Sequence, residues 1–277
     1  MTYLILAILS AAANSLIFRI SEGRVHNRLS MLAGNYAVCL ALALCYLWPA
    51  PLLPHQADLC RAAGLGLING ALFLGGFIMM QRNTRIHGVV LTSVFSRLGV
   101  LVPTLLAITV FGEVPTPLQL TGVVLAVLAI LLMNGRKGQA IRIQPALVLM
   151  LLLSGSCDGM SKVYQQVGEP ALTEHFLVCS FLAALVYNIA LVLYKKERPR
   201  PVDLLFGMAL GVPNYFVARF LLKAVSRIPA VIVYPSFSVG SIILLTAAGV
   251  LFFHERLTRR QEAAMAVILA ALVLLNI

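Results

Sequence analysis

Two charged side chains of opposite sign lie deep inside apolar stretches of the sequence. Arg97 follows the run VVLTSVFS, and Asp158 follows LVLMLLLSGSC. A charge at the centre of a membrane helix costs about 2.5–3.5 kcal/mol, so both side chains are expected to face a polar interior instead of lipid. A guanidinium can hold a carboxylate or phosphate through two parallel hydrogen bonds, and a carboxylate can bind an amine or carry a proton. Arg97 and Asp158 are therefore the first candidates for contact with a polar ligand.

Structural explanations compete with ligand binding for these charges. Arg97 and Asp158 could form an ion pair with each other, and Lys162, one helical turn after Asp158, could neutralise the carboxylate. Arg219 lies near the end of an apolar stretch, so its long side chain is expected to reach the headgroups by snorkelling.

Uncharged polar and aromatic side chains in the other apolar stretches could complete a binding site. The polar residues around Asp158 follow the spacing of one helical face, and the first stretch repeats the pattern more weakly around Asn14. Tyr215 and Tyr234 could offer ring faces to a cation or could simply pack. The candidate substrate-binding residues are Asn14, Asn69, Ser93, Arg97, Asp158, Ser161, Asn214, Tyr215, Tyr234 and Ser238, with Asp158 also the candidate for proton coupling.

Long apolar segments account for nearly the whole chain. Of its 277 residues, 60% are hydrophobic and only 11% are charged, and a membrane-spanning helix needs about 20 apolar residues. Apolar runs bounded by charges, Pro or Gly predict ten spans with short connections and leave no room for an aqueous domain. The predicted spans are 2–20, 30–49, 62–81, 88–111, 118–135, 144–163, 172–194, 203–222, 229–253 and 261–277.

Charge and composition limit the partners. The formal net charge is +11, but Lys and Arg lie in short connections instead of on one face of a folded domain, which argues against nucleic acid. The five cysteines and five histidines are scattered, so neither a metal ion nor a cofactor is expected. The expected partners are the lipid bilayer, a small-molecule substrate and a coupling proton, and the chain is expected to be a monomer or a homodimer.

The two halves of the sequence repeat one another. An offset of 142 residues aligns 85–119 with 227–261 without a gap, and it matches polar pairs such as Ser96/Ser238 and Glu113/Glu255. The predicted units are therefore 1–137 and 138–277, each with five spans. Because five is odd, the second unit must insert with the opposite orientation. Residues present in both copies suggest a scaffold role, and the two glutamates are expected to cap helices or to form ion pairs in loops.

Two motifs carry a resemblance to a known family. FGEVPTPLQLTG and FHERLTRRQ each end an apolar helix with a Glu that is followed by a Thr and a Gln. In this respect the chain resembles the drug/metabolite transporter superfamily and, within it, the ten-helix proteins with two EamA-type repeats. The resemblance covers essentially the whole chain. It implies an all-α membrane protein whose two inverted five-helix repeats surround a central cavity and move small metabolites by alternating access.

The distribution of Lys and Arg predicts an orientation. Connections one, three, five, seven and nine hold 15 of the 21 basic residues, which favours the cytoplasm for these connections and the outside for both termini. Proteins of the superfamily are usually drawn with both termini in the cytoplasm, opposite to this count. The expected location is the bacterial cytoplasmic membrane.

The sequence favours a secondary transporter over an enzyme. A membrane enzyme would need a nucleophile, a metal cluster or paired carboxylates, and Asp158 is the only acid deep in a predicted span. Arg97 and Asp158 together favour a small zwitterion such as an amino acid. The alternatives are a choline-like or drug-like cationic amine held by Asp158 and the tyrosines, and a membrane protein with a purely structural role.

Overall fold

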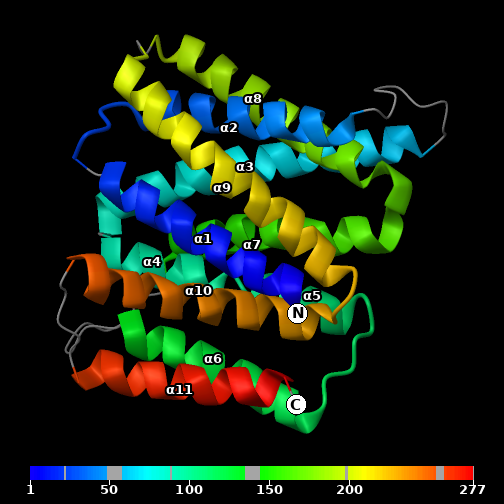
Figure 1. The fold of residues 1–277 in the computed structure, drawn as a ribbon, viewed down its shortest axis with the longest axis vertical. Coiled ribbons are helices and arrows are strands. Elements are labelled where there is room, and N and C mark those ends of the chain that lie inside the picture. Colours follow the sequence, from blue (N-terminus) through cyan, green and yellow to red (C-terminus); the bar gives the residue numbers. More distant parts are fainter. Residues whose placement is uncertain are drawn as a thin grey trace.

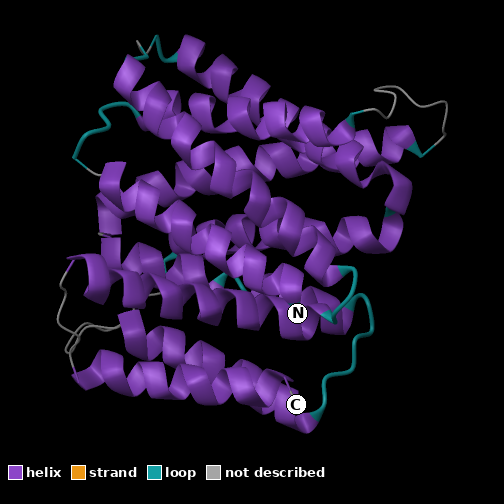
Figure 2. Cartoon of the chain, in the orientation of Figure 1, coloured by secondary structure: helices purple, strands orange, loops and turns teal. Residues whose placement is uncertain are grey.

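A computed structural model describes residues 1–21, 23–48, 58–87, 89–134, 144–196, 199–253 and 259–276. The elements assigned in these ranges are all helical (Figure 2). They are α1 (Thr2–Ser21), α2 (Arg28–Leu47), α3 (Leu59–His87), α4 (Val89–Leu98), α5 (Leu101–Thr109), α6 (Pro117–Asn134), α7 (Pro145–Val167), the short helix η1 (Pro170–Leu172), α8 (Thr173–Tyr194), α9 (Pro201–Val225), α10 (Ala230–Phe253) and α11 (Arg259–Asn276).

Seven of the described helices are long and apolar enough to cross a membrane, as in a multi-pass membrane protein: α1, α2, α3, α7, α8 together with η1, α9 and α10. Three shorter apolar helical stretches occupy the places of the predicted fourth, fifth and tenth spans, and they are Phe95–Thr109, Pro117–Leu132 and Glu262–Leu275. Many leucines, isoleucines and valines on the outer surface are exposed, as lipid contact requires.

The helices lie side by side, with their connections gathered at two ends of the molecule (Figure 1). We call these ends the α1–α2 end and the α5–α6 end, after a connection found at each. Both termini lie toward the α5–α6 end. Helices α2 and α8 form one margin of the molecule and α6 and α11 the other, with α1, α7 and α10 in the middle.

Helix pairs from the two halves pack in corresponding ways. We match α1, α2 and α3 of the first half with α7, α8 and α9 of the second. The contact of α2 with α9 then corresponds to the contact of α8 with α3. The contact of α1 with α9 corresponds in the same way to the contact of α7 with α3. In the same way, α1 against α10 corresponds to α7 against α4 and α5. Two further contacts, α6 with α11 and α2 with α8, each join a helix to its counterpart in the other half.

Glycines allow the closest of these contacts. A Cβ on Gly70 of α3 would lie 2.6 Å from the Cβ of Ala183 on α8, and a Cβ on Gly211 of α9 would lie 2.6 Å from the backbone oxygen of Asn35 on α2. Gly66 precedes Gly70 by one turn and also meets α8 closely. These glycines occupy corresponding places in the two halves, and their hydrogen side chains let the helix backbones touch.

The predicted fourth span is not one continuous helix. It is divided into α4 and α5 by a turn at Gly99 and Val100, which is a correction to the sequence prediction. Pro103 explains the break, because it has no N–H to donate to the carbonyl of Gly99 four residues earlier. That carbonyl instead accepts from the N–H of Val102 at 3.0 Å, a tighter turn. The break places Arg97 in the last turn of α4.

Candidate functional site

A cavity in the middle of the molecule has two lobes. The first has a volume of about 360 Å³ and the second about 340 Å³. Phe18, Met80, Ser96 and Asp158 line both lobes, so the two volumes meet at these side chains. We call the first the arginine lobe and the second the asparagine lobe, after the polar residues that distinguish them. A cavity of this size suits a small metabolite.

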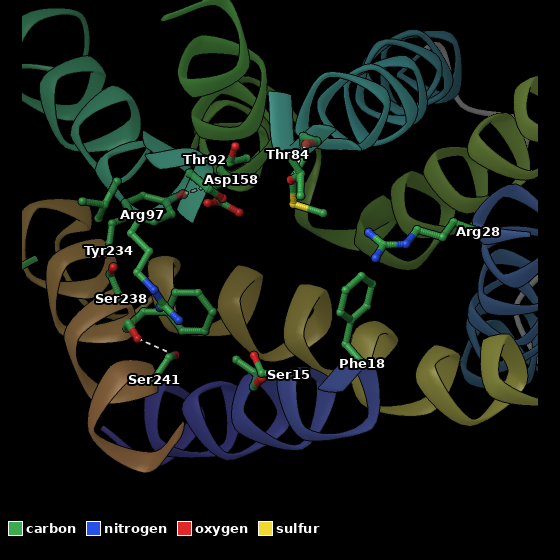
Figure 3. A pocket seen from close by; sticks show the side chains of 15 residues that line it. Ser15, Phe18, Arg28, Thr84, Thr92, Arg97, Asp158, Tyr234, Ser238 and Ser241 are labelled. Carbon is green, nitrogen blue, oxygen red and sulfur yellow. Dashed lines mark hydrogen bonds between the residues drawn. The ribbon is translucent and has the colours of Figure 1, made fainter. Parts of the chain in front are cut away.

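Asp158 lies where the lobes meet, on the middle turns of α7. Its side chain is exposed although it sits inside the bundle, because it faces the cavity. The Tyr234 hydroxyl donates to the backbone oxygen of Asp158 at 3.0 Å, which ties α10 to α7 beside the carboxylate (Figure 3). The carboxylate itself makes no hydrogen bond or ion pair within the described part of the chain. It is therefore free to accept from a ligand.

Arg97 projects into the arginine lobe from α4. Its guanidinium lies near Ser238 and Ser241 of α10, away from Asp158 (Figure 3). Among the described residues no ion pair joins Arg97 to Asp158 or to any other acid. The internal ion pair considered from the sequence is thus not formed, and the two opposite charges both face the cavity.

The asparagine lobe combines amides with aromatic rings. Asn14, Asn35 and Asn214 line it, and the Asn214 Nδ2 donates to the Asn35 Oδ1 at 3.3 Å. The remaining lining residues include aromatic rings, a cysteine and aliphatic side chains. The rings are those of Phe18, Tyr36, Phe73 and Phe77. This lobe therefore offers an apolar surface with a few hydrogen-bonding groups, next to the Asp158 carboxylate.

A buried ion pair lies on the side of the cavity toward the α5–α6 end. Lys162, one turn after Asp158 on α7, places its Nζ 2.8 Å from the Oε1 of Glu113, and both side chains are largely buried. The Glu113 carboxylate also accepts the backbone N–H groups of Ala230 and Val231 at 3.1 and 3.0 Å, which caps the start of α10. The pair therefore joins three elements: α7, the α5–α6 connection and α10.

The environment of Glu113 stabilises its charged form. Burial alone would raise the pKa of Glu113, but the hydrogen bonds from Lys162 and from the N–H groups of Val231 and Ala230, together with the Lys162 charge, lower that pKa below its ordinary value of 4.5. The expected capping or ion pairing of this glutamate is confirmed, since it does both. Its repeat partner Glu255 lies outside the described residues.

Toward the α1–α2 end the cavity adjoins a cleft lined by exposed side chains. Arg28, the first residue of α2, lines both the arginine lobe and a polar cleft of about 220 Å³. The cleft is also lined by the exposed side chains of His26, Arg85 and Lys195. Arg28 therefore stands between the cavity and this cleft, at the end opposite to the Lys162 and Glu113 pair.

Six of the predicted site residues line this cavity. Arg97, Asp158, Tyr234 and Ser238 line the arginine lobe, and Asn14 and Asn214 join Asp158 in the asparagine lobe. The side chain of Ser93 lies outside the described residues. The other three lie apart from the lining, and they are Asn69, Ser161 and Tyr215.

Two of the outlying residues belong to the scaffold. Asn69 is buried and its Nδ2 donates to the Ser180 hydroxyl at 3.2 Å, so it joins α3 to α8. Tyr215 is fully buried, and its hydroxyl accepts from Arg219 at 2.7 Å. Tyr215 does lie near a cation, but the cation is supplied by the protein, 6.0 Å from the ring centre.

Arg219 has protein partners that the sequence did not predict. Its guanidinium pairs with the Glu174 carboxylate at 2.9 Å and lies 3.8 Å from the centre of the Tyr46 ring. Glu174 is 45 residues earlier in the chain, at the start of α8. The ion pair and the ring contact place the charge of Arg219 among α2, α8 and α9, beside the start of α8.

Several residues that line the cavity were not predicted from the sequence. Arg28 was counted only as a connection charge, and Ser15, Asn35 and the aromatic residues of the asparagine lobe were not singled out. Asn35 lies within the apolar run of α2, so it carried the same signal as Asn14. For Arg28 there was no such signal, because its position at a helix start is typical of a topological charge.

Comparison with known proteins adds to the fold but names no activity. No protein-family model matches the chain. An uncharacterized protein of Haemophilus influenzae is 27% identical over 266 residues, which cover 92% of this chain and 91% of that protein. A solved crystal structure is similar with a TM-score of 0.75 at 14% sequence identity, covering 100% of this chain and 99% of that one. At this identity the similarity shows the fold alone.

Proposed function

We propose that this chain is a secondary transporter that moves a small zwitterionic metabolite across the membrane by alternating access. The observation that carries the proposal is the pair of unpaired opposite charges, Arg97 and Asp158, on the walls of one central cavity. Charges inside a membrane protein are costly and are usually kept for a substrate or ion pathway. A zwitterion would satisfy both, with its anionic group on Arg97 and its cationic group on Asp158.

The architecture gives the proposal further support. The corresponding helix contacts of the two halves agree with the sequence repeat, and we propose two inverted five-helix units, 1–137 and 138–277, with ten membrane crossings. Inverted repeats with a cavity between them are a recurrent plan of secondary transporters. The EamA-type resemblance of the sequence fits the same plan. A membrane enzyme or a purely structural membrane protein would have less use for such a cavity.

In this proposal the structure corresponds to one state of the transport cycle. We propose that the cavity opens at the α1–α2 end, where Arg28 also lines the surface cleft, and that the Lys162 and Glu113 pair closes the other end. Among the described residues, the connections at the α1–α2 end carry more Lys and Arg than those at the α5–α6 end, so we place the α1–α2 end in the bacterial cytoplasm and both termini outside. In this orientation the structure is open to the cytoplasm. Opening to the outside would require the Lys162 and Glu113 pair to separate.

A cationic amine is the second candidate substrate. The asparagine lobe places the rings of Tyr36, Phe73 and Phe77 near Asp158, an arrangement that suits a choline-like or drug-like cation. Arg97 distinguishes the two candidate substrates, because a cation without an anionic group cannot form an ion pair with its guanidinium. Loss of the Arg97 charge should weaken the binding of a zwitterion and should not weaken the binding of an amine.

A thermal-shift screen of the purified full-length protein tests the proposed substrate class. A ligand that binds only the folded state raises the apparent melting temperature. We expect some zwitterionic amino acids to stabilise the wild type, and Arg97→Ala and Asp158→Asn each to remove that stabilisation. Arg61→Ala, which removes an exposed charge away from the cavity, is the matched control. If both cavity variants kept the full response to every stabilising zwitterion, the proposal would be wrong.

A further inference from the structure

The cavity contains a second guanidinium that a simple zwitterion would leave unpaired. Arg28 lines the arginine lobe at the end away from Arg97 (Figure 3). Its guanidinium lies 5.6 Å from the centre of the Phe18 ring, and no acid among the described residues pairs with it. Phe18 lines both lobes, so Arg28 stands beside the common part of the cavity.

The position of Arg28 is fixed by the backbone around it. The Asn27 Oδ1 caps α2 by accepting from the N–H groups of Leu29 and Ser30 at 2.9 and 3.2 Å. The preceding turn is held by Asp203 of α9, which is fully buried and accepts from the N–H groups of His26 and Asn27 at 2.9 and 3.3 Å. Arg28 is therefore attached to a well-anchored helix start, not to a free loop.

The charges that face the cavity do not balance. In the described lining of the two lobes, Arg28 and Arg97 are opposed by a single acid, Asp158. Ligand charges opposite to those of the lining are attracted, so an occupant that completes the charge balance is favoured over one that does not. The matching occupant has one more negative than positive charge.

The surface cleft next to the cavity is lined by basic side chains, so its charge has the same sign as the excess charge in the cavity. The polar cleft that leads to Arg28 is lined by His26, Arg85 and Lys195 and by no acid among the described residues. A surface of one sign raises the local concentration of ligands of the other sign. The cleft would therefore concentrate anions at the mouth of the cavity.

We propose that the substrate carries one cationic group and two anionic groups, as an acidic amino acid does. Its amine lies at Asp158, one carboxylate at Arg97, and the second carboxylate at Arg28. This inference rests on the proposed transport of a zwitterion and adds a third charge to that substrate. It makes Arg28 the residue that distinguishes an acidic substrate from a neutral one.

Binding of isosteric pairs to the purified full-length protein tests this inference. The probes are glutamate with glutamine and aspartate with asparagine, measured at one ionic strength. Each pair differs only in a carboxylate against an amide. We expect the wild type to bind the acid about tenfold more tightly than the amide, since a charge-assisted hydrogen bond is gained. Arg28→Gln should bring that ratio close to one, and Arg28→Lys should keep part of it.

A matched control separates the role of Arg28 from the charge of its connection. Arg24 is exposed and lies four residues earlier, but it lines neither the cavity nor the cleft, so Arg24→Gln should keep the full ratio. If the wild type bound the amide as tightly as the acid, or if Arg28→Gln kept the preference, the inference would be overturned and the transport of zwitterions would stand. If no zwitterion bound at all, the proposed function would fail with it.

Discussion

At the scale of single residues, opposite charges are held apart by the helices that carry them. Arg97 ends α4 at a break caused by Pro103, and Asp158 lies on α7 with its backbone tied to Tyr234. The sequence indicated both residues because charges in apolar runs need a polar environment. It could not indicate Arg28, whose role depends on the placement of the start of α2 at the cavity, or Arg219, whose partner is distant in the chain.

The geometry of Arg97 leads to a first prediction. A guanidinium can form two parallel hydrogen bonds with a carboxylate, whereas an ammonium acts as a point charge. We expect Arg97→Lys to weaken zwitterion binding about tenfold and Arg97→Ala to weaken it further. Isothermal titration of the purified variants measures this. If the lysine and alanine variants bound the zwitterion equally, the two parallel hydrogen bonds of the guanidinium would matter at this position and its positive charge would not.

The ion pair at the closed end leads to a second prediction, on pH. The folded state lowers the pKa of Glu113, so the carboxylate stabilises the protein above its unfolded pKa, and this stabilisation is lost as the pH falls through the lowered value. Glu113→Gln leaves Lys162 buried without its partner and should cost about 3–5 kcal/mol of stability near neutral pH.

Thermal melting over a pH series measures this cost. The difference in melting temperature between wild type and Glu113→Gln should be constant from about pH 7 to pH 5 and should shrink below the ordinary value of 4.5. Glu169→Gln is the control, because Glu169 is exposed at the same end of the molecule. A difference that grew as the pH fell would contradict the assignment.

At the scale of helices, the fold depends on close backbone contacts in corresponding places. Gly66 and Gly70 on α3 meet α8, and Gly207 and Gly211 on α9 meet α2. Because glycine has no Cβ, the helix backbones approach closely at both places. This role depends on which helix lies against each glycine, so it becomes visible only when the helices are compared in space.

Gly70 gives the third prediction. Its added Cβ would lie 2.6 Å from the Ala183 Cβ and 2.7 Å from the backbone nitrogen of Ala184, so α3 and α8 would have to move apart. We expect Gly70→Ala to cost about 1–3 kcal/mol. Gly64→Ala on the same helix meets nothing within 4 Å and should leave the melting temperature unchanged or raise it. Equal effects of the two substitutions would contradict this packing.

At the scale of the whole molecule, the order of apolar segments predicted the order of the described helices, but not the break between α4 and α5 or the continuation of α3 to His87. Orientation is harder to predict, because charge count and family resemblance disagree. We predict that a cysteine introduced at Arg24 reacts with a membrane-impermeant thiol reagent only when the cytoplasmic face is accessible, in a variant whose native cysteines are replaced. Labelling of intact cells at this position would reverse the proposed orientation.

The most direct test of the central claim is solute flux in proteoliposomes. Wild-type protein should exchange a radiolabelled zwitterionic amino acid, identified by the binding screen, between the two sides of the membrane without changing it chemically. The double variant Arg97→Ala, Asp158→Asn should lose this exchange while it remains folded. Flux that is the same with the double variant as with the wild type would contradict transport through the cavity, and so would chemical conversion of the solute without flux.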